Sequence, residues 1–257
     1  MESLLTLPLA GEARVRILQI TDTHLFAQKH EALLGVNTWE SYQAVLEAIR
    51  PHQHEFDLIV ATGDLAQDQS SAAYQHFAEG IASFRAPCVW LPGNHDFQPA
   101  MYSALQDAGI SPAKRVFIGE QWQILLLDSQ VFGVPHGELS EFLLLHHHPL
   151  PAGCSWLDQH SLRNAGELDT VLAKFPHVKY LLCGHIHQEL DLDWNGRRLL
   201  ATPSTCVQFK PHCSNFTLDT IAPGWRTLEL HADGTLTTEV HRLADTRFQP
   251  DTASEGY

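Results

Sequence analysis

Short apolar runs that each stop abruptly at polar side chains recur along the first part of this chain. Residues 15–20, 58–61 and 88–91 are such runs, and aspartate, histidine or asparagine follows each of them within a few positions. Apolar runs bounded by turn residues predict buried strands. Between these runs, residues 39–49 and 74–84 carry apolar side chains at helical spacing. Strands that alternate with helices predict a parallel sheet with helices packed on its faces.

After about residue 189 the pattern changes. Asn195-Gly196 and Asp233-Gly234 are two-residue turn signals between alternating segments, so residues 189–242 are expected to form antiparallel hairpins. A chain that combines alternating strands and helices with hairpins is predicted to have a mixed α/β fold. Before this change the earlier alternation continues, with strands expected at residues 122–127, 143–145 and 178–182 and a helix at residues 167–175.

Nothing in the sequence divides the chain into two units. The sequence contains no internal repeat, low-complexity tract or linker, and its 257 residues are enough for one large domain with a substantial core. Residues 15–242 are therefore expected to form a single domain, preceded by an N-terminal extension at residues 1–14. Residues 243–257 are polar and are expected to form a loosely ordered tail.

One junction does not fit the alternation of strands and helices. Between the strand that is expected to end near Asp128 and the strand that is expected to begin near Leu143, the chain is rich in glycine and proline. Residues 139–142 then resemble the start of a helix that does not continue. Parallel neighbours need a crossover of roughly a dozen or more residues, usually helical. We therefore predict that a helical segment near Phe142 is missing from this chain.

The polar side chains at the predicted strand ends form the best candidate for a functional site. In open α/β sheets, ligands bind outside the carboxyl ends of the strands. One strand that ends in polar residues indicates a turn, whereas several in succession indicate a site. The candidates are Asp22, His24, Asp64, Asn94, His95, His147 or a neighbouring histidine, His185 and His187.

The chemistry of these side chains favours two metal ions. Carboxylate, imidazole and amide donors without thiolates suit divalent manganese, iron, zinc and cobalt. The set is too large for one ion and suits two ions that share a carboxylate. Two such ions, about 3.5–4 Å apart, can hold a phosphoryl oxygen and activate water for attack. His95 directly follows a candidate ligand, and imidazole suits proton donation near neutral pH. Asp96 or Asp68 could hold the other ring nitrogen of His95.

The charge and the cysteines limit the partners and the compartment. The formal net charge is −14, from 16 Lys and Arg against 30 Asp and Glu. A nucleic-acid surface needs clustered positive charge, so no nucleic-acid partner is expected. An anionic substrate would also be repelled by the net charge, unless two divalent ions supply a local positive field. Neither a signal peptide nor a membrane span is expected, because the N-terminus lacks a basic region and no apolar run approaches the length of a membrane span. Five scattered cysteines predict reduced thiols in a cytoplasmic protein.

Five motifs together resemble the motif set of the calcineurin-like metallophosphoesterases. They follow the same order and occupy strand ends from residue 15 to about residue 190, and the combination is far more specific than any one of them. Their surroundings are similar to those of the class III cyclic-nucleotide phosphodiesterases. The motifs are Asp22-Thr-His24, Gly63-Asp64, Gly93-Asn94-His95-Asp96, His147-His-Pro149 and Gly184-His185-Ile-His187.

The resemblance implies a fold and a reaction. The fold is a four-layer sandwich of two mixed sheets that pack face to face, with helices on the outside. The reaction is hydrolysis of 3′,5′-cyclic AMP to 5′-AMP by a hydroxide activated by two divalent ions. Iron and manganese are the expected ions, with zinc and cobalt as alternatives. The resemblance leaves the number of subunits open.

The resemblance also assigns roles to single residues. Asp64 bridges the two ions, and His95 protonates the leaving 3′ oxygen. His146 and His148 are expected to support the site or to lie in the core. The first ion is held by Asp22, His24 and His187, the second by Asn94, His147 and His185, and the substrate is contacted by His24, Asn94, His95 and His187.

Other functions share these motifs. A protein phosphatase, a nucleotidase or a nuclease would use the same metal site, although the acidic charge disfavours the nuclease. A fold that only binds another protein is a more remote alternative, because every ligand position is filled. Substrate choice is expected to depend on residues 25–37, residues 202–209 and the C-terminal tail. Phe209 or Phe26 could stack on a base, although an isolated aromatic side chain more often serves packing.

Overall fold

The computed structural model describes residues 4–8, 14–119, 122–131, 133–135 and 145–256. The segment that is predicted to be missing near Phe142, and most of the strand that is expected at residues 143–145, lie outside the described residues. Among the described residues, none of the helices combines the length and the hydrophobicity needed to span a bilayer.

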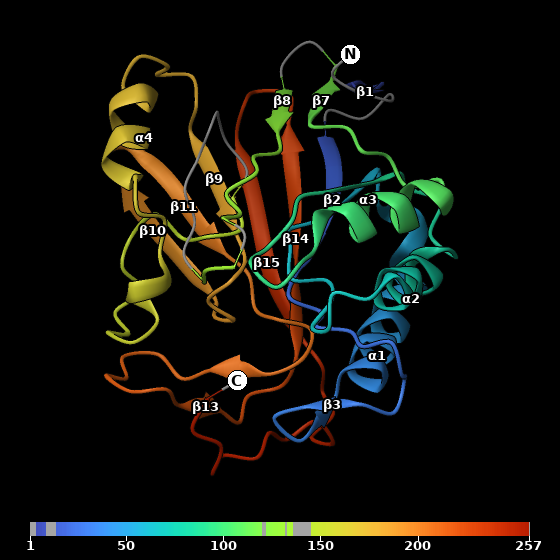
Figure 1. Cartoon of the computed structure of the whole chain (residues 1–257). Coiled ribbons are helices and arrows are strands. Elements are labelled where there is room, and N and C mark those ends of the chain that lie inside the picture. The colour runs from blue at the N-terminus through green and yellow to red at the C-terminus, as the bar shows by residue number, and fades with distance from the viewer. Residues whose placement is uncertain (1–3, 9–13, 120–121, 132, 136–144, 257) are drawn as a thin grey trace.

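A five-stranded mixed sheet forms one inner layer (Figure 1). Its strands are β2 (Arg14–Ile20), β5 (Leu58–Ala61), β6 (Cys88–Trp90), β14 (Gly224–His231) and β15 (Leu236–Arg242). The order is β15-β14-β2-β5-β6, with β2, β5 and β6 parallel and β14 antiparallel to both of its neighbours. The parallel strands are those that the alternating pattern predicted.

The other inner layer consists of two three-stranded groups. One has the order β1-β7-β8 and the other β10-β11-β9. The hairpin predicted at Asn195-Gly196 is confirmed, and both turn residues have a positive φ. The strands are β1 (Leu4–Leu7), β7 (Arg115–Ile118), β8 (Trp122–Leu125), β9 (Tyr180–Cys183), β10 (Leu190–Trp194) and β11 (Arg197–Ala201), while β3 (Ala32–Leu33) pairs with β4 (Val36–Asn37) and β12 (Gln208–Phe209) with β13 (Leu218–Asp219).

Helices cover the outer faces of both layers (Figure 1). Helix α1 (Thr38–Ile49) begins at Asn37, whose side chain accepts a hydrogen bond from the Glu40 amide, and α2 (Ser71–Ile81) begins at Ser70 in the same way. Together with α3 (Gln98–Asp107) they cover the five-stranded sheet, whereas α4 (Ala165–Leu172) covers β9–β11. Short 3₁₀ helices are η1 (Arg50–Glu55) and η2 (Asp158–His160).

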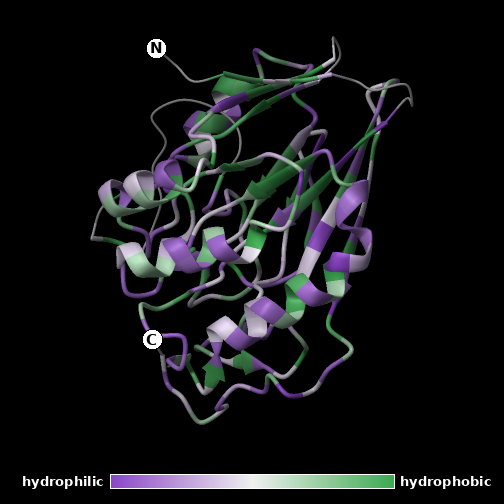
Figure 2. Ribbon diagram, turned by 90° about the vertical axis from the view of Figure 1, so that its right-hand side faces the viewer, coloured by the Kyte–Doolittle hydropathy of each residue, from purple (hydrophilic) through white to green (hydrophobic). Residues whose placement is uncertain are grey.

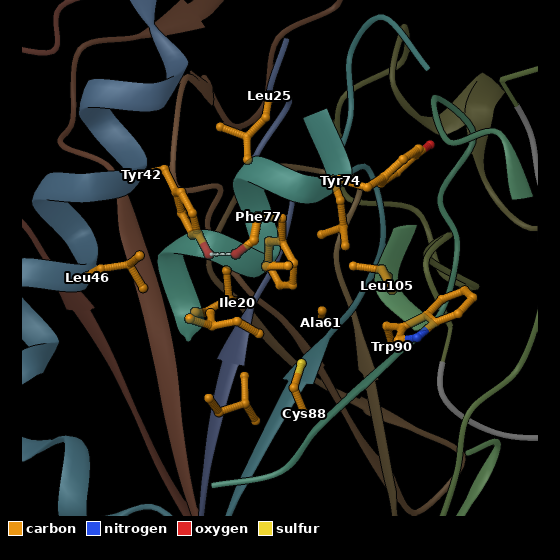
Figure 3. Close-up of a cluster of buried hydrophobic side chains, with 14 of the residues drawn as sticks. Ile20, Leu25, Tyr42, Leu46, Ala61, Tyr74, Phe77, Cys88, Trp90 and Leu105 are labelled. Carbon is orange, nitrogen blue, oxygen red and sulfur yellow. Dashed lines mark hydrogen bonds between the residues drawn. The ribbon is translucent and has the colours of Figure 1, made fainter. Parts of the chain in front are cut away.

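Three clusters of buried side chains separate the layers. The alternation of side chains along β2 sends Val15 and Ile17 into the space between the sheets, and Leu18 and Ile20 into the cluster beneath α1 and α2. Figure 3 shows this second cluster, in which the Tyr42 hydroxyl donates to the Phe77 carbonyl. Hydrophobic residues concentrate in the strands and hydrophilic residues on the helices (Figure 2). The expected four-layer arrangement is confirmed.

Both ends of the chain take part in the packing. Residues of the N-terminal extension form β1, which pairs in parallel with β7. In the C-terminal tail, Phe248 is buried in the cluster beneath α4, and the Asp251 amide donates to the Leu34 carbonyl. The described part of the tail is therefore held against the body by an apolar anchor, which the expectation of a loosely ordered tail overlooked.

A cavity of about 500 Å³ lies between β8 and β9. Its lining is mostly apolar and includes Ile124, Tyr180, Leu182 and Leu228. The Leu145 amide donates a hydrogen bond to the Leu182 carbonyl at this edge of β9.

Candidate metal centre

The carboxyl ends of β2, β5, β6 and β9 meet at one rim, and every predicted site residue lies on a loop that follows one of these strands or on the segment after Leu145. Backbone hydrogen bonds join the first two loops, since the Asp22 amide donates to the Gly63 carbonyl and the His24 amide to the Asp64 carbonyl, each at 3.0 Å. At Gly93, an added Cβ would collide with the Asp64 side chain, so only glycine permits this approach of the loops.

The backbone of the rim is unusual. The described residues include nine non-glycine residues with a positive φ, and five of these nine are predicted metal ligands. Aspartate, asparagine and histidine are enriched in this conformation, and its concentration at one place indicates a functional site. The five are Asp22, His24, Asp64, His185 and His187.

Asp22, His24 and His187 form the first cluster of donor atoms, and all three are buried. His187 Nε2 lies 3.3 Å from Asp22 Oδ1 and 3.1 Å from His24 Nε2. The opposite ring nitrogens are fixed by oxygen atoms, because His187 Nδ1 contacts the Val207 carbonyl at 3.0 Å and His24 Nδ1 contacts Gln67 Oε1 at 2.6 Å. Nε2 of both rings is therefore left to face the shared space.

The second cluster lies beside Asp64 and includes His146, which was expected to support the site or to lie in the core. His146 Nε2 lies 3.2 Å from Asp64 Oδ2 and 3.2 Å from Asn94 Oδ1, while His146 Nδ1 contacts the Thr62 carbonyl at 2.8 Å. His147 Nδ1 instead contacts Ser129 Oγ at 2.8 Å. Donor atoms of His146, His147 and His185 lie within 4.8 Å of one another. In the sequence, the run of three histidines at residues 146–148 was the feature that could have indicated His146 as a residue of the site.

These residues fit a pair of metal ions. Among the described residues, His185 Nε2 is buried without a hydrogen-bond partner, although a buried polar atom is normally satisfied. Asp64 belongs to a donor group with His24 and His95 and to another with Asp22 and His146, so its carboxylate lies between the two clusters. Carboxylate, imidazole and amide donors with a shared carboxylate are the set that two borderline divalent ions require.

The electrostatics of the rim follow from burial and from close opposite charges. Burial by itself would raise the pKa of Asp64, but His146 lowers this pKa well below its usual range. Burial would lower the pKa of His146, yet Asp64 raises it to about 9. Burial lowers the pKa of His24 to about 3, and burial with His147 lowers that of His185 strongly. His24 and His185 are thus neutral near pH 7, as metal ligation requires.

Asp96, whose role the motif left open, braces two loops. Its Oδ1 accepts hydrogen bonds from the Leu65 and Ala66 amides, and its Oδ2 accepts one from the Gly93 amide, at 2.9–3.1 Å. Asp68 accepts from the Ala27 and Ser70 amides. Both carboxylates that were considered as partners for the His95 ring thus hold backbone amides.

His95 lies at the edge of the rim, half-buried. Its amide donates to Asp64 Oδ1 at 2.8 Å, and its ring packs edge-on against His24 with 5.1 Å between the centroids. Together with Asn94 and His185 it lines a cavity of about 390 Å³. A substrate in this cavity would therefore lie between His95 and the donor clusters.

The two aromatic residues considered as base-stacking candidates serve packing. Phe209 is 1% exposed and stacks on the His187 ring at 4.3 Å with an interplanar angle of 10°. Phe26 packs at the margin of the buried cluster that also contains Phe209. Phe209 therefore supports a candidate metal ligand.

Comparison with known proteins identifies relatives of this chain. The model of the calcineurin-like phosphoesterase family matches residues 15–189. The chain is 94% identical to the 3′,5′-cyclic adenosine monophosphate phosphodiesterase of Escherichia coli over the full length of both proteins. It is 50% identical to the Haemophilus influenzae protein of that name, with 95% of each chain covered.

The alignment with the Escherichia coli protein is longer than this chain. It spans 275 positions, whereas this chain has 257 residues, so at least 18 positions of that relative have no counterpart here. This difference agrees in size with the predicted loss of a helical segment.

Solved structures share the fold at low sequence identity. A dimetal phosphatase from Danio rerio is 13% identical, with a TM-score of 0.56 and coverage of 87% of this chain and 98% of that one. The GAP50 anchor of the Plasmodium inner membrane complex is 12% identical, with a TM-score of 0.59 and coverage of 95% and 90%. These likenesses support the four-layer architecture alone.

Proposed function

Because the chain belongs to the calcineurin-like phosphoesterase family, we propose that it hydrolyses 3′,5′-cyclic AMP to 5′-AMP with the help of two divalent metal ions. The observation that carries this proposal is the position of Asp64, whose carboxylate lies between the two clusters of buried donor atoms. The names of the Escherichia coli and Haemophilus influenzae relatives support the substrate.

The first ion would be held by Asp22, His24 and His187, with Asp64 shared between both ions. For the second ion, the motif resemblance favours Asn94, His147 and His185, and the short contacts of His146 with Asp64 and Asn94 add His146. When bound, such ions offset phosphate charge and activate the attacking water. Iron and manganese suit this donor set, with zinc and cobalt as alternatives.

His95 would act as the general acid. In the reaction the new bond forms between water oxygen and phosphorus, the bond from phosphorus to the 3′ oxygen breaks, and that oxygen takes a proton from the His95 ring. The position of His95 supports this role, because its backbone is fixed to Asp64 while its side chain lines the cavity. His24, Asn94 and His187 would also contact the phosphate.

The burial of four of the five free cysteines supports a reduced, cytoplasmic protein. We also propose that residues 15–242 act as one catalytic domain.

A comparison of substrates tests the proposed reaction. Metal content and kcat/KM are measured for 3′,5′-cyclic AMP, 3′,5′-cyclic GMP and 2′,3′-cyclic AMP. Two ions per chain and a preference for 3′,5′-cyclic AMP are expected. Equal rates on all three substrates and on simple phosphomonoesters would indicate a broader phosphoesterase instead.

A further inference from the structure

The cavity beside the metal centre is lined by two chemically different sets of residues. Asn94, His95 and His185 belong to the metal centre, whereas Trp156 and Phe216 are aromatic. The volume of about 390 Å³ falls within the range of about 300–1,000 Å³ that is usual for small-molecule sites. No lysine, arginine or carboxylate is among the described residues that line it, so its aromatic part suits an uncharged, flat group.

The aromatic side chains of this cavity form one packed group. Trp156 contacts Phe209 and Phe216 edge-on, with 5.0 and 5.1 Å between the ring centroids, and Phe209 and Phe216 are 5.7 Å apart. Phe209 also borders the cavity, but it is 1% exposed and one face of its ring stacks on His187. Trp156 and Phe216 are only partly buried and line the cavity. They are the aromatic surfaces of this group that a ligand could reach.

We infer that Trp156 and Phe216 form the subsite for the purine base of the nucleotide. This inference rests on the proposed function, because the phosphate is proposed to lie at Asn94, His95 and His185, which line the same cavity. An aromatic wall binds bases by stacking, which contributes without base-specific hydrogen bonds. The subsite therefore adds affinity for a nucleotide over a sugar phosphate, and it does not by itself distinguish adenine from guanine.

The packing links this subsite to the metal centre. Phe209 is in contact with Trp156 on one side and with the His187 ring on the other. The base wall and a candidate metal ligand are thus parts of one rigid group, which sets the position of the base relative to the phosphate.

Inhibition constants test the inference directly. The inhibition constants of 5′-AMP and ribose 5-phosphate are measured against hydrolysis of a generic chromogenic phosphodiester, and KM is measured for 3′,5′-cyclic AMP. In Trp156→Ala, the inhibition constant of 5′-AMP and the KM for 3′,5′-cyclic AMP are expected to rise about tenfold, a typical stacking effect. The kcat and the inhibition constant of ribose 5-phosphate are expected to change little. Phe216→Ala is expected to act in the same direction, and Trp156→Phe to keep most of the affinity.

Trp39→Ala is the matched control, because Trp39 lies on α1 against His76 and does not line this cavity. The subsite is rejected if the two inhibitors weaken equally in both alanine variants, or if neither weakens. Failure of the proposed function shows separately. In that case the wild type would not hydrolyse 3′,5′-cyclic AMP, although the inhibitor comparison on the chromogenic substrate would still report on the base.

Discussion

His146 Nε2 lies 3.2 Å from Asp64 Oδ2, closer than His24 Nε2, which lies 3.9 Å from the same oxygen. The next residue, His147, contacts Ser129. His146 and His147 lie at bends in the backbone with their ring centroids 5.0 Å apart, so the local turn decides which of the two histidines faces the shared carboxylate. A helical segment is predicted to be missing near Phe142, shortly before His146. A change of chain length at that place would affect which histidine faces Asp64.

Single substitutions in the histidine run separate the two assignments. His146→Ala is expected to bind one ion per chain instead of two, because it removes the nitrogen between Asp64 and Asn94. His147→Ala is expected to keep more of the second ion. Metal content after dialysis, measured by mass spectrometry, checks both. The reverse result would assign the ligand to His147, as the resemblance to the family implies, and would leave His146 as a support.

His95→Ala tests the general acid. Turnover is expected to fall by roughly 10²–10⁴, because the leaving oxygen would depart without a proton, while metal content stays unchanged. A substrate with a leaving group that needs no proton, such as a nitrophenyl phosphodiester, should lose much less activity. A loss of metal from this variant would instead show that His95 is a ligand.

Asp64→Asn tests the shared carboxylate. The amide keeps the shape of the side chain and can still accept the hydrogen bond from the His95 amide. It lacks the negative charge that two ions share, so both ions are expected to bind more weakly. Calorimetric titration of the metal-free protein with Mn²⁺ measures the two affinities. If one site keeps its affinity, Asp64 does not bridge.

Asp96→Ala tests the brace between the loops. It would leave the Leu65, Ala66 and Gly93 amides without their acceptor, and unsatisfied buried donors cost about 1–3 kcal/mol each. We expect the free energy of unfolding to fall by about 2–4 kcal/mol in urea denaturation. Asp68→Ala, which affects exposed hydrogen bonds, serves as the control and should cost much less.

Lys114 gives a pH-dependent prediction outside the metal centre. Burial lowers the pKa of its ammonium group to about 8, from an ordinary value of 10.5, where it donates to the Trp90 carbonyl. Between these two values the unfolded chain binds more protons than the folded one, so stability rises with pH in this window. Lys114→Met should remove that part of the rise, by up to a few kcal/mol. Unfolding curves for both proteins from pH 7.5 to 10.5 measure the difference, and parallel curves would contradict it.

Most of the rim could be predicted from the sequence, because its residues follow directly from strand ends. A parallel sheet brings the carboxyl ends of neighbouring strands together, so Asp22, Asp64 and Asn94 were expected at one place without knowledge of the loops. The layers were predictable for a related reason, since the alternation of strands and helices restricts the possible architectures.

The remaining features depend on local bends and on contacts between loops. The orientation of His146 follows from the bends at His146 and His147, which composition does not reveal. The brace by Asp96 requires the amides of two loops that are about 30 residues apart in the chain to meet. The aromatic group around Trp156 joins residues from three segments, whereas the sequence shows each ring in isolation.

The left-handed backbone of the rim restricts how this centre can change during evolution. Five predicted ligands adopt a positive φ, a conformation that aspartate, asparagine, histidine and glycine enter more readily than other residues. A change of ligand must therefore satisfy the backbone as well as the ion. Aspartate, asparagine and histidine can both adopt a positive φ and bind the ion, whereas a cysteine would meet the steric penalty of the left-handed region. Lineages with this rim can exchange one borderline divalent ion for another, but the backbone opposes a drift toward thiolate-bound metals.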